Sequence, residues 1–204
     1  MDIDGTILNC KGQIETETVQ ALSLLEKFMD IYLVTSLPYP YAYKRCKSVW
    51  NMVKGGIFGN GSDIRSQNDI FVKPMSDTII GLLEKKKISY SAYKEKGQVH
   101  KIIVRNLSME QLRQLEVSLK QYHIVREGNI TSITEKEATK LNGILYLLHL
   151  LSVEEKETIV VGNSRNDIPM LQYFACSFAV PTAEEIVKKS AAYESSLENI
   201  FDYI

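Results

Sequence analysis

The chain has 204 residues, of which 45% are hydrophobic and 24% are charged, and its formal net charge is −1. This length suits one domain with a smaller insertion, and the near-neutral charge argues against nucleic acid or an anionic membrane as a partner. The three cysteines form no CxxC pair, which argues against a zinc site and is consistent with a reduced, cytoplasmic compartment. The most apolar helical segment, residues 141–151, is too short to span a bilayer.

Helices and short apolar strands alternate in the first part of the chain. The predicted elements are a helix over residues 16–29, a strand over 31–34, a helix over 41–52, a strand over 55–58 and a hairpin with strands over 64–65 and 70–72. The apolar run at residues 31–34 is typical of a buried strand. Strands that alternate with helices in this way predict a parallel α/β sheet.

The middle of the chain changes to a pattern of helix, two strands, helix and two strands. The predicted elements are a helix over residues 77–87, strands over 88–94 and 100–105, a helix over 109–122, and strands over 123–126 and 130–134. Strands joined by short turns pair antiparallel. We therefore interpret residues 66–134 as an inserted α+β module (αββαββ) within an α/β domain formed by residues 1–65 and 135–204.

The α/β pattern returns after the inserted module. The predicted elements are a helix over residues 139–151, a strand over 158–161, a helix that ends at residue 174, a strand over 177–180, and helices over 183–191 and 197–204. The chain therefore begins and ends with the same kind of secondary structure.

The first six residues place two carboxylates two positions apart. In an extended segment, side chains at positions i and i+2 point the same way, so Asp2 and Asp4 can share one site. Such a pair can help to bind a divalent metal, or one carboxylate can act as a nucleophile while the other carries a proton. Taken alone, these residues are more typical of an acidic chain end of no special function.

Polar residues also follow two of the predicted buried strands. Ligands of open parallel α/β sheets bind beyond the carboxyl ends of the strands, so these residues are expected to meet the first residues of the chain. They are Thr35, Asn163, Asn166 and Asp167.

Lys140 begins the apolar helix that precedes the last of these strands. An ammonium and a threonine hydroxyl suit a phosphate group, and carboxylates suit Mg²⁺. The combination predicts phosphoryl transfer through an aspartyl-phosphate. Lys136 is an alternative to Lys140, and we favour Lys140 because the apolar helix starts at Leu141.

The four motifs, in this order, resemble those of haloacid dehalogenase-like (HAD) phosphatases of the Cof type, and of the similar sucrose-phosphate, mannosylphosphoglycerate and archaeal phosphoglycolate phosphatases. The family's DxDGT motif stands at residues 2–6, its strand-ending hydroxyl at Thr35, its lysine at Lys140 and its GDxxND motif at residues 162–167. The resemblance spans essentially the whole chain. It implies an HAD-like Rossmannoid parallel sheet with an α+β cap, of the family's class II, at the position of the inserted module.

The resemblance also implies a role for each matching residue. Asp2 would attack the phosphorus, and Asp4 would protonate the leaving alcohol and then activate water. The implied phosphate-binding residues are Thr35, Lys140 and Asn166. The implied Mg²⁺ ligands are Asp2, Asp4 through its main-chain carbonyl, Asn163 and Asp167.

Three positions depart from the family pattern. Asn163 replaces the aspartate of GDxxND, so we expect weaker Mg²⁺ binding, because hard cations prefer carboxylates. Ser36 and Leu37 replace the Gly-Arg that usually follows the hydroxyl. Only Met1 precedes Asp2, where the family has the central first strand of a sheet in the order 5-4-1-2-3. We therefore expect a truncated first strand, with the true start upstream.

These observations predict a Mg²⁺-dependent phosphomonoester hydrolase that acts on a small phosphorylated metabolite, such as a sugar phosphate, as a monomer or a homodimer. The alternative is an impaired relative that binds a phosphorylated ligand without turnover, for which Asn163 and the short first strand are the reasons. A phosphomutase is less favoured, because mutases of this superfamily usually carry a helical cap.

Overall fold

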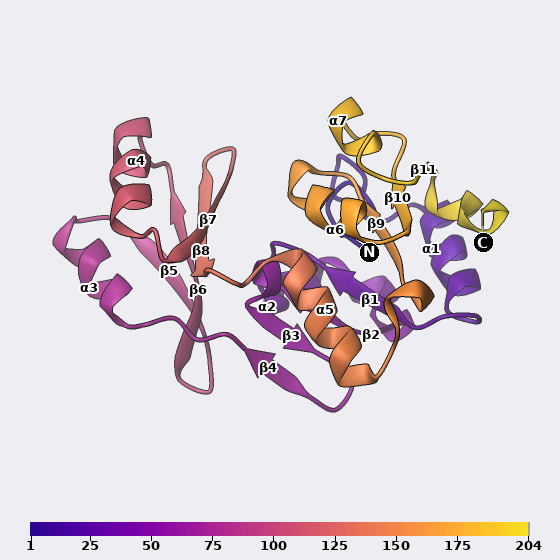
Figure 1. Ribbon diagram of the computed structural model, residues 1–204, viewed down its shortest axis with the longest axis horizontal. Helices are drawn as coiled ribbons and strands as arrows, with labels where there is room; N and C mark the ends of the chain where they lie inside the picture. Colours follow the sequence, from indigo (N-terminus) through magenta and orange to yellow (C-terminus); the bar gives the residue numbers. More distant parts are fainter. Residues whose placement is uncertain (204) are drawn as a thin grey trace.

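The α/β part of the computed structural model, which describes residues 1–203, is built from short buried strands and helices that lie far apart in the sequence (Figure 1). Its first elements are α1 (Thr16–Leu25), β1 (Ile31–Val34), α2 (Tyr39–Arg45), the 3-10 helix η1 (Lys47–Met52), β2 (Val53–Phe58), η2 (Gly59–Gly61), β3 (Asp63–Arg65) and β4 (Ile70–Val72). Its later elements are α5 (Lys140–Leu151), η3 (Glu155–Glu157), β9 (Ile159–Gly162), η4 (Arg165–Asp167), α6 (Ile168–Tyr173), β10 (Cys176–Ala179), α7 (Glu185–Lys188), β11 (Tyr193–Glu194) and η5 (Leu197–Asp202).

The unit between β4 and α5, called the cap below, is an antiparallel sheet with two helices. It contains α3 (Thr78–Lys85), β5 (Tyr90–Glu95), β6 (Gln98–Arg105), α4 (Met109–Ser118), β7 (Tyr122–Glu127) and β8 (Ile130–Glu135), with the strand order β5-β6-β8-β7. Side chains such as Leu83, Ile102 and Leu115 form a buried cluster of its own. Figure 1 shows α3 and α4 on the side of the sheet that faces away from the α/β part, so the other face is turned towards it.

The first residues of the chain join two sheets of the α/β part. One sheet has the order β1-β2-β3-β4, with β1 and β2 parallel, and the other has the parallel order β11-β10-β9. The amine of Met1 donates to the carbonyl of Tyr32 at 2.7 Å, and the Val34 amide donates to the Met1 carbonyl at 2.8 Å. On the other side, the Asp2 amide donates to the Val161 carbonyl of β9 at 2.9 Å. The predicted α/β fold with a parallel sheet and an inserted α+β unit is therefore confirmed.

A cavity of about 550 Å³ lies between β1 and β9, next to Met1. Met1 lines it together with apolar side chains of α1, α5 and η5. Alternate residues of a strand direct their backbone polar groups to the same side. Asp30 and Ile159 stand two positions before the residues bonded to Met1 and Asp2, so they present backbone groups to this cavity. The cavity lies at the amino ends of these strands, away from Thr35 and Gly162.

One domain boundary, two helices and one strand differ from the sequence predictions. The predicted division between residues 65 and 66 falls within the β3–β4 hairpin, and β4 pairs with β3 in the α/β sheet. We propose instead that the cap begins after β4. The helix predicted over residues 41–52 is α2 followed by η1. The helix predicted over residues 197–204 is the 3-10 helix η5, which ends at Asp202, and Ile204 lies outside the described residues. The two-residue strand β11 was missed because it is too short to show a pattern.

Among the helices of residues 1–203, none combines the length and the hydropathy of a membrane-spanning segment.

We expect a short apolar strand fused before Met1 to fill the cavity between β1 and β9. An extension of about five Val, Ile and Ala residues, a typical strand length, would pair with both strands and bury two or three side chains. It would also replace the buried amine of Met1, whose pKa burial lowers to about 6. The free energy of unfolding in urea should rise by about 2–5 kcal/mol. A Gly-Ser extension of the same length is the control, and equal stability of the two fusions would contradict the expectation.

Candidate active site

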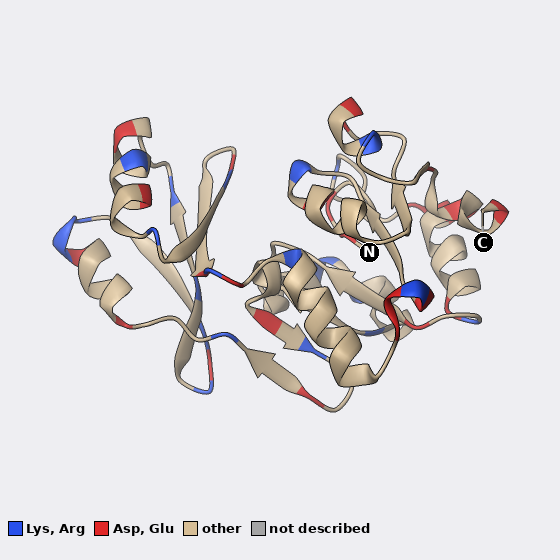
Figure 2. Ribbon diagram, viewed as in Figure 1, with Lys and Arg blue, Asp and Glu red and all other residues tan. Residues whose placement is uncertain are grey.

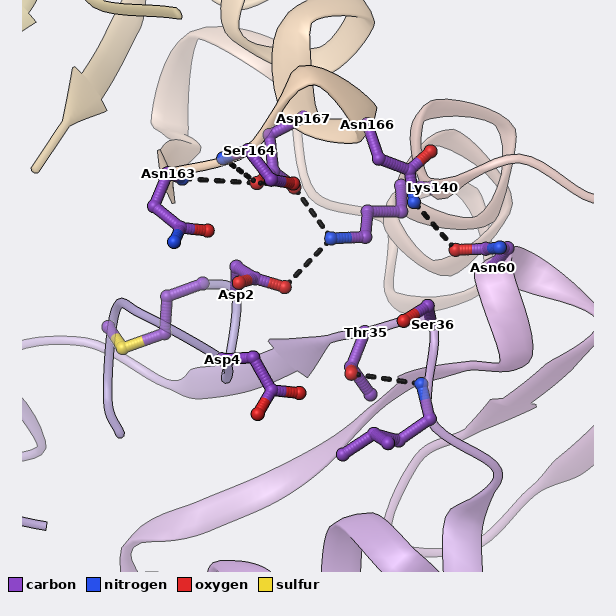
Figure 3. A network of polar contacts seen from close by, with 12 residues as sticks. Asp2, Asp4, Thr35, Ser36, Asn60, Lys140, Asn163, Ser164, Asn166 and Asp167 are labelled. Atoms are coloured by element: carbon purple, nitrogen blue, oxygen red, sulfur yellow. Dashed lines mark hydrogen bonds and ion pairs between the residues drawn. The ribbon is translucent and has the colours of Figure 1, made fainter. Parts of the chain in front are cut away.

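Four segments that lie far apart in the sequence meet at the carboxyl ends of β1 and β9 (Figure 3). The first residues contribute Asp2 and Asp4, Thr35 follows β1, Asn163 follows β9, and Lys140 begins α5. Thr139 caps α5, since its hydroxyl accepts a hydrogen bond from the Asn142 amide at 3.1 Å. Parallel strands end at the same edge of a sheet, which explains why polar residues after β1 and β9 come together.

The ammonium of Lys140 lies between two buried carboxylates. Its Nζ donates to Oδ1 of Asp2 and to Oδ1 of Asp167, each at 2.7 Å. Lys140 and Asp2 are each 4% exposed and Asp167 is fully buried. The three groups together carry one net negative charge when both carboxyls are ionised, and this charge is held almost without contact with water.

Asp167 is held in place by the loop that follows β9. Its Oδ2 accepts hydrogen bonds from the amides of Asn163 and Ser164, at 3.0 and 2.9 Å, and from the Ser164 hydroxyl at 2.9 Å. Gly162 allows this close approach, because a Cβ on residue 162 would lie 2.6 Å from the Cβ of Asp167. Both carboxylate oxygens of Asp167 are thus occupied. In this geometry Asp167 orients Lys140, and its role as a Mg²⁺ ligand stays a prediction.

The three charges shift one another's pKa values in different directions. Burial raises the pKa of Asp2 to about 7, with Lys140 acting against this rise and Asp167 adding to it. Burial also acts to lower the pKa of Lys140, but the carboxylates of Asp2 and Asp167 outweigh it and the pKa is raised. For Asp167, burial acts to raise the pKa, whereas Lys140 and the amides after β9 lower it. Lys140 and Asp167 therefore form an ion pair near neutral pH, whereas the pKa of Asp2 lies close to neutral.

The other predicted site residues lie close by but outside this network. The carboxylate of Asp4 forms an ion pair with Nη1 of Arg45, and its side chain is 45% exposed. Thr35 is buried, and its Oγ1 accepts a hydrogen bond from the Leu37 amide at 3.1 Å. Asn166 reaches across the site, where its Nδ2 donates to Oδ1 of Asn60 at 2.9 Å.

Three buried polar atoms in the segments that build this site have no hydrogen-bond partner within residues 1–203. They are Thr6 Oγ1, Asn60 Nδ2 and Asn163 Oδ1. An unsatisfied buried polar group costs about 1–3 kcal/mol, and a bound polar ligand would remove this cost. Their concentration here supports a ligand site at this edge of the sheet.

The oxygen atoms around Asp2 fit a Mg²⁺ ion of modest affinity. Residues 1–203 contain no cluster of three or more His, Cys, Asp and Glu side chains that could hold a metal. Mg²⁺, however, is commonly bound by one or two carboxylates, with waters and substrate phosphate oxygens completing its shell. Asp2 supplies a carboxylate, and the unpaired Oδ1 of Asn163 is directed towards Asp2 in Figure 3. The donor set suits a hard cation, with less negative charge than a site that has aspartate at residue 163.

Sequence reasoning did not predict three side chains that contact the site residues. Arg45 and Asn60 contact Asp4 and Asn166 across long stretches of chain, and no local pattern encodes such contacts. Ser164 had a readable signal, because a serine three residues before an acidic residue is typical of a capping box.

The family described as haloacid dehalogenase-like hydrolase matches residues 83–200, which is more than half of the chain. The chain belongs to this family. The predicted resemblance to haloacid dehalogenase-like proteins is confirmed, and the matched residues include Lys140 and the loop after β9.

Curated relatives of this hydrolase include phosphoglycolate phosphatases of archaea. That of Methanothermobacter thermautotrophicus is 22% identical over 207 residues, which cover 96% of this chain and 90% of the relative. That of Methanobrevibacter smithii is 26% identical over 211 residues, which cover 95% of this chain and 89% of the relative.

Solved structures support the same fold. A putative HAD/COF-like hydrolase from Plasmodium vivax has a TM-score of 0.84 at 17% identity, covering 98% of this chain and 92% of the other. A sugar phosphatase of HAD subclass IIB has a TM-score of 0.81 at 20% identity, covering 97% of this chain and 93% of the other.

We expect Lys140→Met to destabilise the hydrolase by about 3–5 kcal/mol, because it leaves Asp2 and Asp167 buried side by side without a cation. Urea denaturation at pH 8 measures the effect. Lys136→Met is the matched control, since Lys136 is exposed four residues earlier and its loss should change stability by less than about 0.5 kcal/mol. Similar effects of the two substitutions would contradict the central role of Lys140.

We expect Asp2→Asn to stabilise the protein in EDTA at pH 8 by about 1–3 kcal/mol. The pKa of Asp2 is 3.8 ordinarily and about 7 in the folded protein, so folding takes up a proton between these values and stability falls as pH rises through this window. The asparagine removes this penalty, and its advantage should therefore vanish below pH 4. Thermal unfolding from pH 4 to 8 is the measurement. A loss of stability at pH 8 would mean that the ion pair with Lys140 outweighs the cost of burying the carboxylate.

Proposed function

We propose that the protein is a phosphomonoester hydrolase that acts on a small phosphorylated metabolite through an aspartyl-phosphate on Asp2. The observation that carries this proposal is the 2.7 Å contact between Lys140 and the buried carboxylate of Asp2, at the strand ends where Thr35 and Asn166 also lie. The names of the phosphoglycolate and sugar phosphatases above support the same reaction class.

In the first step, an oxygen of Asp2 attacks phosphorus while the bond from phosphorus to the leaving oxygen breaks. Lys140 neutralises charge on the transferring phosphoryl group, and Thr35 and Asn166 donate hydrogen bonds to its oxygens. The Asp2 carboxyl must be ionised to attack. Its pKa of about 7 makes its reactivity sensitive to the cations around it.

Asp4 is proposed to move the protons. It donates a proton to the leaving alcohol, then takes one from the water that attacks phosphorus and releases phosphate from Asp2. In the structure its carboxylate pairs with Arg45, so it must leave this partner to act as an acid.

Asp2, the Asp4 main-chain carbonyl and Asn163 would hold Mg²⁺. The ion would supply positive charge beside Asp2 and the phosphoryl oxygens, which favours the ionised carboxylate. Asp167 contributes indirectly by fixing Lys140.

The second candidate function is binding of a phosphorylated ligand without turnover. Asn163 favours it, because its amide oxygen supplies no charge to a cation. For both candidate functions, the cytoplasmic location of the protein and its monomeric or homodimeric state stay predictions.

Hydrolysis of p-nitrophenyl phosphate with and without Mg²⁺ tests the proposed function. We expect activity that Asp2→Asn lowers by about 10³-fold or more. Asn163→Asp should lower the Mg²⁺ concentration for half-activation by about tenfold, because it adds a carboxylate to the site. The rise in melting temperature with Mg²⁺ concentration is an independent measure of the affinity of the protein for Mg²⁺. Activity in Asn163→Asp with none in the natural sequence would favour ligand binding without turnover.

A further inference from the structure

A lysine of the cap reaches the candidate active site. Lys101 lies in β6, is 0% exposed, and its Nζ donates to the main-chain carbonyl of Ser36 at 2.7 Å. Its neighbours Ile102 and Val104 belong to the buried cluster of the cap. Alternate side chains of a strand face opposite ways, so Lys101 points out of that cluster and towards the α/β part. Its ammonium therefore ends beside the loop that holds Thr35.

The ammonium of Lys101 is buried without a matching charge. It forms no ion pair with a carboxylate of residues 1–203, and the Ser36 carbonyl takes one of its three N–H donors. Burial lowers the pKa of Lys101 to about 7, with Glu127 acting against this fall and the positive charge of Lys140 adding to it. A buried charge is costly unless it is paired. Lys140, equally buried, has two carboxylates, whereas Lys101 has none.

The surroundings hold Lys101 in this position. Its stem lies against Gly59, where a Cβ would come within 3.2 Å of Lys101 Cδ. Glu127, the acidic residue that acts on it, is engaged elsewhere, since its Oε2 accepts a hydrogen bond from the Ser36 hydroxyl at 3.3 Å. Lys101 is thus held in place beside the loop that carries Thr35, close enough to Lys140 for the two charges to act on each other, and a neighbouring anion would favour its charged form.

We propose that Lys101 binds a second anionic group of the substrate, a carboxylate or phosphate on the leaving group, while Lys140 serves the phosphoryl group. This inference rests on the proposed function and narrows it to small phosphomonoesters that carry two anionic groups. A second anion would supply the charge that Lys101 lacks and occupy its remaining donors. Because Lys101 is fully buried, such a substrate enters when the cap moves away, and its second anion favours the closed position of the cap.

Two substrates of nearly the same shape test the proposal. Phosphoglycolate carries a carboxylate where 2-hydroxyethyl phosphate carries a neutral hydroxymethyl group. Wild type should prefer phosphoglycolate. Lys101→Met and Lys101→Gln should each lower the ratio of the two kcat/KM values by about 10- to 100-fold, the range for losing a hydrogen bond between charged groups. The glutamine retains a donor for the Ser36 carbonyl, so it separates loss of charge from loss of that contact.

Lys94→Met is the matched control, since Lys94 is an exposed cap lysine on the neighbouring strand β5, and it should leave the ratio unchanged. Equal losses on both substrates in Lys101→Met would overturn the proposal and make Lys101 a latch that closes the cap. An unchanged ratio would overturn it as well.

A binding measurement separates this inference from the proposed function. If wild type hydrolyses neither substrate, calorimetry with phosphoglycolate and with inorganic phosphate decides. Weaker binding of phosphoglycolate alone by Lys101→Met and Lys101→Gln would support the role of Lys101 in a protein that binds without turnover. Equal binding by wild type and both variants would overturn it.

Discussion

A single buried ammonium organises the candidate site of this hydrolase. Lys140 contacts the first residues of the chain through Asp2 and the loop after β9 through Asp167, each at 2.7 Å. It also begins α5, so the same residue ties a helix to two strand ends. With two carboxylates for one cation, the cluster is stable only while the ammonium stays in place. Because Asp2 shares Lys140 with Asp167, its negative charge is only partly compensated. This suits a carboxylate that is proposed to bind a metal ion and a phosphate ester.

The position of Asp2 depends in turn on very few backbone contacts. Met1 and Asp2 occupy the gap between β1 and β9 and are bonded to both strands. At the other end of these strands the gap is a cavity lined by apolar side chains. The two ends of one sheet therefore differ in character, since the carboxyl ends hold a charged cluster and the amino ends an incompletely filled apolar space. Figure 2 shows that many charged residues lie in loops and near the ends of helices and strands.

Much of this arrangement could be predicted from the sequence because it follows from local patterns. Alternating helices and strands indicated the α/β part, and the ordered motifs indicated that Asp2, Thr35 and Lys140 would meet. These motifs indicated that Lys140 and Asp2 would lie in one site. They did not indicate that Asp167 would bind Lys140, because an acidic residue in a loop can bind either a metal ion or an ammonium group. The pairing of Asn166 with Asn60 and the reach of Lys101 from the cap depend on how distant segments pack. In the sequence, Lys101 is one lysine among many, and only its burial in the structure distinguishes it.

The hydrogen bond from Asp2 to Val161 has a consequence for how the protein is made. It joins Asp2 to a strand that lies far along the chain, so the two segments can pair only after that strand has left the ribosome. The cap strands, by contrast, pair with near neighbours in sequence and can form while synthesis continues. The nascent α/β part must therefore keep its first residues available, with β1 and β2 already paired, until β9 arrives. The candidate active site therefore assembles only after β9 has been synthesised, because Asp2 is bonded to a residue of that strand.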